Sequence, residues 1–337
     1  MRNAAQIFSV LGLLCGGWAG AQGLAASDVS VPIWSLADAP FLKARYPGFV
    51  PFEKTVLHVG GSRINAYLSG RDSDRETAVD RPMVLNWVST AAKAVSSYYG
   101  KYPVDVVSIV LLQTPGNGIH SGETFSGHLI KMKIGVATAK EEFAQDWTMT
   151  HEMFHLGFPD LNNIHLWMNE GEAVYLEPIA RVRIGDITVD EMWRGMVEGL
   201  PKGLPESGDK GLDHTATWGR TYWGGTLFWF LADVEIRKQT HNKHSIDDAM
   251  RAMLNAGGDG SELWPMRNVL DACDAATETK VVSELYAKMA NAPMDVDLDA
   301  LWVSLGVKKL RNGTIRYNDA APLAYIRKSI TDPKSNP

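Results

Sequence analysis

The sequence predicts an α+β fold in which strands come first along the chain and helices follow. An apolar, β-branched run at 104–112 and an alternating run at 128–134 are typical of strands. From residue 139 onward, apolar residues recur almost everywhere at helical spacing. The 337 residues are 45% hydrophobic and 21% charged, which is typical of a folded globular chain rather than a disordered or collagen-like one.

The first half contains one predicted hairpin, one helix and two longer strands. Residues 55–58 and 63–68 flank Gly60-Gly61 and form the hairpin. Residues 84–99 form a helix that Gly100 ends. We expect 104–112 to be a buried strand because it is continuously apolar, and 128–134 to be a half-exposed edge strand because it alternates.

The second half is predicted to be helical, with loops rich in Gly and Pro between the helices. A capping box at Thr138 and Glu141 is expected to start the first of these helices, and Gly157 to end it. The predicted helices cover 139–156, 169–182, 188–199, 221–239, 245–255, 261–274 and 279–290.

Residues 1–21 have the pattern of a signal peptide. A positive charge at Arg2 precedes an apolar stretch at 7–15 and the small residues Ala19-Gly20-Ala21. The apolar stretch is shorter than the roughly 20 residues of a bilayer span, which disfavours the alternative of an uncleaved anchor. We therefore expect an exported protein, periplasmic or secreted, that has no membrane span after cleavage.

The net charge argues against one class of binding partner, and the cysteine count argues against disulfides. Lys and Arg total 33 against 39 Asp and Glu, a net charge of −6, or −6 − 1 = −7 once Arg2 is removed. An acidic chain is a poor match for the phosphate backbone of nucleic acids, so no nucleic-acid partner is expected. Cleavage would leave Cys273 as one thiol, buried in a helix and without an internal disulfide.

The mature chain divides into four predicted segments. Residues 22–83 are an extended and β-rich lead-in, and 84–240 form the main α+β body. Residues 241–310 are a helical C-terminal part, and the polar residues 311–337 are a loosely held tail.

The strongest chemical signal is His151-Glu152-Met153-Phe154-His155. Positions i and i+4 of a helix share one face, so both imidazoles can reach one metal ion. This is the H-E-x-x-H arrangement of zinc peptidases, in which the glutamate acts as general base.

A third ligand is needed, and Glu170 in Asn169-Glu170-Gly171 is the candidate. Asn169 would cap a helix, and Glu172 would point about 200° away from Glu170 around that helix. The alternative is that both acids are ordinary first-turn residues favoured by the helix dipole.

These residues, together with 222–228, resemble the gluzincin metallopeptidases. The similarity is greatest to the glycyl aminopeptidase-like branch that is related to the alanyl aminopeptidases, and it covers roughly residues 85–307. The resemblance implies a thermolysin-like catalytic fold and one Zn²⁺ ion held by His151, His155 and Glu170. It also implies that Tyr222 donates a hydrogen bond to the oxyanion of the reaction; aromatic packing is the alternative for Tyr222.

Aminopeptidases of this type hold the amino terminus of the substrate with a glutamate that precedes the zinc helix. The corresponding stretch here, 118–128, is rich in glycine, and its Glu123 could fill that role. A glycine-rich loop without a ligand role is the alternative.

The sequence therefore predicts zinc-dependent hydrolysis of peptides, aminopeptidase-like, with Glu152 moving the proton. Asp160, Glu172 and Glu177 are candidate partners for the second ring nitrogens of the ligand histidines. The alternatives are an endopeptidase of the same fold, a zinc-bearing protein that binds peptides without cleaving them, and a structural envelope protein.

Overall fold

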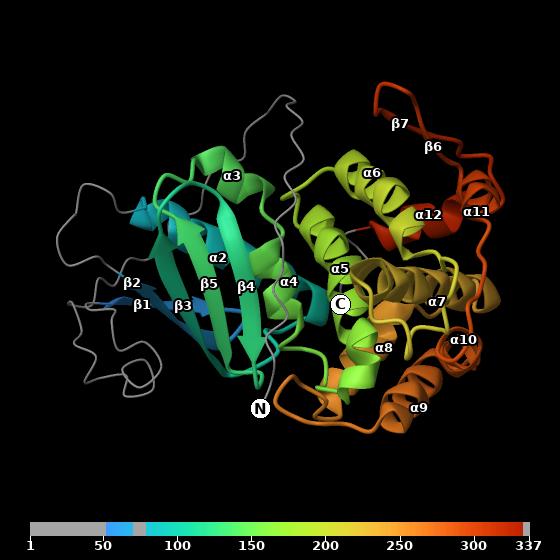
Figure 1. The fold of residues 1–337 in the computed structure, drawn as a ribbon, viewed down its shortest axis with the longest axis horizontal. Coiled ribbons are helices and arrows are strands. Elements are labelled where there is room, and N and C mark those ends of the chain that lie inside the picture. Colours follow the sequence, from blue (N-terminus) through green and yellow to red (C-terminus); the bar gives the residue numbers. More distant parts are fainter. Residues whose placement is uncertain (1–51, 70–78, 333–337) are drawn as a thin grey trace.

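The computed structural model describes residues 52–69 and 79–332 (Figure 1). The predicted signal peptide and most of the lead-in lie outside these residues. Within them, no helix combines the length and the apolar character needed to cross a membrane.

A five-stranded mixed sheet forms the first half of the molecule (Figure 1). Its order is β1-β2-β3-β5-β4, with parallel pairs β2–β3 and β3–β5 and antiparallel pairs at both edges. The predicted hairpin is confirmed as β1 and β2, which join the same sheet as the later strands. The strands are β1 (Phe52–Val59), β2 (Ser62–Ser69), β3 (Val106–Thr114), β4 (Ile119–Phe125) and β5 (Leu129–Gly135).

The expectation that 128–134 forms an edge strand is wrong. β5 lies between β3 and β4, and β4 is the edge strand. The sequence hid β4 because Gly122 occupies a position that faces the neighbouring helix. A Cβ atom there would lie 2.6 Å from Cγ of Glu152, so no apolar side chain fits and the alternation is lost.

Helix α2 (Arg81–Tyr99) packs on one face of the sheet and confirms the predicted helix. Asp80 accepts a hydrogen bond from Met83 N at its start, and Gly100 adopts a left-handed conformation, φ 80°, at its end. Val88 of α2 and Ile109 and Met132 of the sheet belong to the same buried core.

The predicted helix 139–156 is split in two, α3 (Lys140–Gln145) and α4 (Thr148–Phe154). Asp146 is extended, and its Oδ2 accepts hydrogen bonds from Met149 N and from the indole of Trp87. The capping box also differs: Glu142, not Glu141, accepts from a backbone N–H, that of Ala139.

The second half is helical and stacks beside the sheet (Figure 1). Helix α5 runs through it and contacts α2, α4 and α7. The helices are α5 (Leu166–Arg183), α6 (Val189–Gly199), α7 (Gly225–Gln239), α8 (Ile246–Asn255), α9 (Met266–Thr277), α10 (Val281–Met289) and α11 (Leu298–Leu305), with the short turns η3 (Asn163–His165), η4 (Leu200–Gly203) and η5 (Gly219–Gly224).

Residues 311–332 are not a loosely held tail. They contain β7 (Ile315–Tyr317), which pairs with β6 (Val307–Lys309), and α12 (Ala324–Ile330). Ile326 and Ile330 are fully buried, and Arg327 donates to the carbonyl oxygens of Leu305 and Gly306. The polar composition of this segment suggested a tail, but one of its charged residues, Arg327, is buried and donates hydrogen bonds to backbone carbonyls inside the fold.

A buried ion network joins α5, α7 and α8. Arg183 Nη2 lies 2.7 Å from Asp247 Oδ2, and Arg237 contacts both Asp247 and Asp233. Burial alone would raise the pKa of Asp247, but Arg183 and Arg237 hold it below its ordinary value. Both charges of the Arg183–Asp247 pair are at most 4% exposed, so neither can be solvated if the other is lost.

We expect Asp247→Asn to lower the free energy of unfolding by about 3 kcal/mol, because it leaves Arg183 buried without its counter-charge. Asp271→Asn is the control, because the Arg267–Asp271 pair is 80% and 58% exposed and its loss should cost less than about 1 kcal/mol. Urea unfolding measures both variants. Equal effects would contradict the assignment of the network as structural.

Candidate metal centre

The histidine pair of the H-E-x-x-H motif is brought together by α4. His151 lies in its last turn, and His155 follows the helix in near-helical geometry, φ −58° and ψ −17°. The two Nε2 atoms are 3.2 Å apart. His151 is 3% exposed and the side chain of His155 is 15% exposed, so the pair is largely buried.

Glu170 of α5 completes a three-residue cluster with the two histidines. Its Oε2 lies 3.1 Å from Nε2 of His151 and 3.6 Å from Nε2 of His155. Among the residues described, this is the group whose donor atoms suit a metal ion. The predicted N-cap role of Asn169 is wrong: α5 begins at Leu166, and the Asn169 side chain donates to the Pro159 carbonyl.

The cluster fits a zinc ion. Bonds of 2.0–2.1 Å in a tetrahedral arrangement place neighbouring donor atoms about 3.3 Å apart, which matches the three separations here. The charges also fit a cation. Burial alone would lower the pKa of His155, yet Glu170 raises it to about 9. Burial alone would raise the pKa of Glu170, yet its hydrogen bonds to the two histidines hold it far below the ordinary value.

The three predicted partners of the ligand histidines have different places. The backbone of Asp160 forms an isolated β-bridge with Leu263, and the Glu177 side chain forms an ion pair with Arg181 at 2.8 Å. Glu172 is fully buried, accepts from the Tyr99 hydroxyl at 3.3 Å, and has a pKa that burial raises to about 8. Within the described chain, His151 Nδ1 is buried without a hydrogen-bond partner.

Glu152 points toward the edge strand β4. Oγ1 of Thr124 lies 2.7 Å from its Oε2 and 2.9 Å from its backbone oxygen. Burial raises the pKa of Glu152, which brings the carboxylate closer to the range of a useful proton acceptor. Sequence reasoning missed Thr124. The signal that could have found it is its position two residues after Gly122 on the same strand face.

Glu123 is not brought to the cluster. Neighbouring side chains of a strand point to opposite faces, and Gly122 and Thr124 face Glu152. Glu123 therefore points to the other face, where it pairs with Lys131 of β5. This placement contradicts the expectation that Glu123 holds the substrate's amino terminus.

Tyr222 is brought to the cluster by η5, a short π-helical segment that leads into α7. Its ring stacks against His151 with centroids 6.4 Å apart. Burial and the charges of Glu170 and Glu152 raise its pKa, so the hydroxyl remains protonated near neutral pH and can donate a hydrogen bond. Arg220 on the same segment forms a buried ion pair with Asp209 at 2.7 Å, which fixes η5 to the preceding loop.

Close packing explains why residue 171 is a glycine. An added Cβ at Gly171 would lie 2.2 Å from the carbonyl carbon of Gly225, at the junction of η5 and α7. The two backbones touch, so α5, which carries Glu170, and η5, which carries Tyr222, have one fixed separation. A π-helical turn at this junction is a common feature of functional sites.

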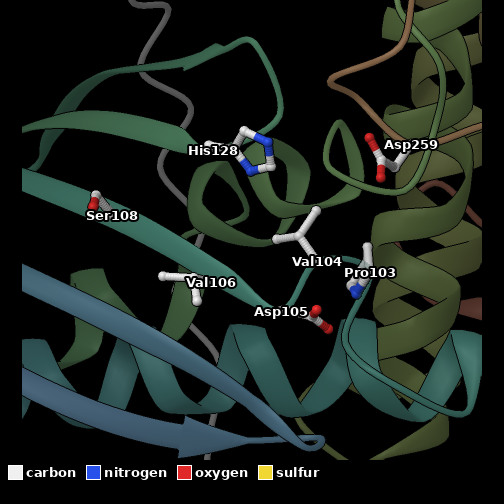
Figure 2. Close-up of a pocket in the computed structure, with 7 residues that line it drawn as sticks. All are labelled: Pro103, Val104, Asp105, Val106, Ser108, His128 and Asp259. Atoms are coloured by element: carbon white, nitrogen blue, oxygen red, sulfur yellow. The ribbon is translucent and has the colours of Figure 1, made fainter.

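A separate cavity of about 540 Å³ lies at the start of β3 (Figure 2). His128, Asp105 and Asp259 line it, and it shares no lining residue with the metal cluster. It is therefore not part of this candidate site.

We expect Gly171→Ala to lower both zinc retention and thermal stability, since the new methyl group must push α5 away from Gly225. The control is Gly195→Ala in α6, where an added Cβ meets nothing within 4 Å. That variant should gain up to about 1 kcal/mol of stability from helix propensity. Metal analysis of purified protein and thermal unfolding measure both. Full zinc content in Gly171→Ala would show that the contact does not position Glu170.

Comparisons with known proteins bear on the fold of this chain. No family model and no curated protein matches the chain. An aminopeptidase N family protein from Idiomarina loihiensis has a similar structure, with a TM-score of 0.58, 15% identity, and coverage of 80% of this chain and 53% of that one. The M1 zinc metallopeptidase of Deinococcus radiodurans is more distant, with a TM-score of 0.47, 13% identity, and coverage of 73% and 53%.

The chain spans about half the length of these two proteins. The similarity to the Idiomarina protein shows a shared fold and confirms at that level the resemblance that the sequence motifs predicted. The chain thus has the mixed helix-and-sheet fold of an aminopeptidase N family protein.

Proposed function

We propose that this protein is a zinc-dependent peptidase of the gluzincin type with a thermolysin-like catalytic fold. The observation that carries the proposal is the convergence of His151, His155 and Glu170 from two helices to separations suited to one Zn²⁺ ion. Glu152 and Tyr222 border the same cluster. A non-catalytic zinc site would not need these last two groups.

Each side chain has a distinct task. A zinc ion at the cluster would polarise the scissile carbonyl and lower the pKa of the attacking water toward about 7. Glu152 accepts the proton of that water and passes it to the leaving amine. Thr124 holds Glu152 by its hydrogen bond. Tyr222 donates its hydroxyl hydrogen to the negative oxygen that develops on the carbonyl.

The substrates in this proposal are peptides, and the activity is aminopeptidase-like, which the fold supports. Endopeptidase activity is the second candidate. The placement of Glu123 favours this candidate. Glu123 was the residue predicted to bind the amino terminus of the substrate, and it faces away from the cluster. The signal-peptide pattern of residues 1–21 supports an exported enzyme, periplasmic or secreted.

We expect Glu152→Gln to keep zinc and lose at least about 100-fold in kcat, because the amide cannot accept the proton. Metal analysis and digestion of a mixed peptide pool measure the two properties. Glu141→Gln, an exposed change on α3, is the matched control. Removal of zinc by a chelator should abolish hydrolysis, and added zinc should restore it. Undiminished turnover by Glu152→Gln would disprove the role of this residue.

A pair of peptides with the same sequence, one with a free and one with an acetylated amino terminus, separates the two candidates. If the enzyme is aminopeptidase-like, acetylation should reduce cleavage by about 100-fold or more, since the amine contributes a charged hydrogen bond. Glu123→Gln should change kcat/KM by less than about twofold, because this side chain faces away. Mass spectrometry of the products locates the cut, and cleavage of internal bonds in the acetylated peptide would replace the first candidate by the second.

A further inference from the structure

Two tryptophans border the metal cluster and are unusually exposed. Trp147 is 49% exposed and Trp218 is 56% exposed, whereas Trp167, Trp193 and Trp229 are at most 2% exposed. An indole is the largest apolar side chain, and exposed apolar groups that gather at one place mark binding sites.

Both indoles contact residues of the candidate site. Trp147 meets the ring of His151 edge-on, with centroids 5.2 Å apart. Trp218 packs at a tilt against Tyr222, with centroids 6.0 Å apart. Since Tyr222 stacks on His151, the four rings form one row with the metal ligand and the hydroxyl donor in the middle and a tryptophan at each end.

The same spacing places both tryptophans. Trp147 precedes His151 by four residues, and Trp218 precedes Tyr222 by four. Residues four apart lie on one face of a helical segment, so each indole shares the face of the site residue that follows it. Each exposed tryptophan therefore lies on the same helical face as a residue of the candidate site and in ring contact with it.

Trp218 is also held in orientation. The ammonium of Lys202 lies 6.0 Å from its ring and 5.5 Å from the ring of Trp223, both within cation–π range. This charge makes the Trp218 end of the row unfavourable for a cationic side chain. The apolar ring beside it remains available.

We propose that Trp147 and Trp218 are specificity-determining residues that bind bulky apolar side chains of a peptide next to the bond to be cleaved, and that Lys202 disfavours Lys and Arg at the Trp218 end. The proposal rests on the proposed peptidase function and names its substrate class. The occupant is a peptide in extended form, because only a chain that crosses the cluster can reach both ends of the row.

The experiment measures binding and cleavage separately. Peptides that differ only in carrying Phe, Ser or Lys beside the susceptible bond are bound to zinc-loaded Glu152→Gln by calorimetry and cleaved by the otherwise unchanged enzyme. We expect Phe to be preferred over Ser and Lys in both assays. In Trp147→Ala and Trp218→Ala the preference for Phe over Ser should fall by roughly tenfold, as expected for loss of an apolar pocket wall.

Three further variants make the result specific. Trp218→Phe keeps an aromatic ring and should retain most of the preference. Tyr325→Ala, a change of a 43% exposed aromatic residue on α12, should leave it unchanged. Lys202→Gln should raise the relative binding of the Lys peptide. Metal content and thermal unfolding verify that each variant is folded.

The outcomes separate the two levels of proposal. If peptides bind with the expected preference but are not cleaved, the peptidase function fails and the role of the tryptophans stands. If peptides are cleaved and neither alanine variant changes the preference, the role of the tryptophans is overturned and the peptidase function stands. Absence of any peptide binding would overturn the inference as well.

Discussion

The contact between the backbones of Gly171 and Gly225 fixes Glu170 and Tyr222 relative to each other. The two glycines approach each other so closely that no Cβ atom fits at Gly171, so α5 and the η5–α7 junction are in direct backbone contact. Glu170 precedes the first glycine and Tyr222 lies three residues before the second. The third candidate ligand and the hydroxyl donor therefore lie next to one close backbone contact that links their two segments.

The charges of the side chains around His151 and His155 also favour a bound cation. Glu152 and Glu172 are buried and the Glu170 side chain is 16% exposed, close to two imidazoles, and buried carboxylates without a counter-charge are costly. Burial alone would lower the pKa of His155, but the carboxylate of Glu170 raises it to about 9. A divalent ion would supply that positive charge permanently and leave both imidazoles neutral, as metal ligation requires.

The edge strand β4 and the aromatic row both contact residues of this centre. Thr124 on β4 holds Glu152, while the absence of a side chain at Gly122 makes room for the carboxylate. His151 and Tyr222 stack on each other, and their rings also contact Trp147 and Trp218, respectively. In the proposed mechanism, Thr124 of the sheet holds the proton acceptor Glu152, and rings from the helices contact the side chains of the substrate.

The spacing of His151, Glu152 and His155 is a local property of one helix, so the sequence alone predicted these three residues. The order of strands followed by helices was also predictable, because apolar periodicity is local to each segment. The sequence also indicated Glu170 and Tyr222 through short motifs. Three features could not be predicted from the sequence and are seen only in the folded chain: β4 is a strand, Glu123 faces away from the cluster, and Thr124 holds Glu152. Those outcomes depend on which strand pairs with β5 and on the pleat that alternates its side chains, and both are set by contacts between segments far apart in the chain.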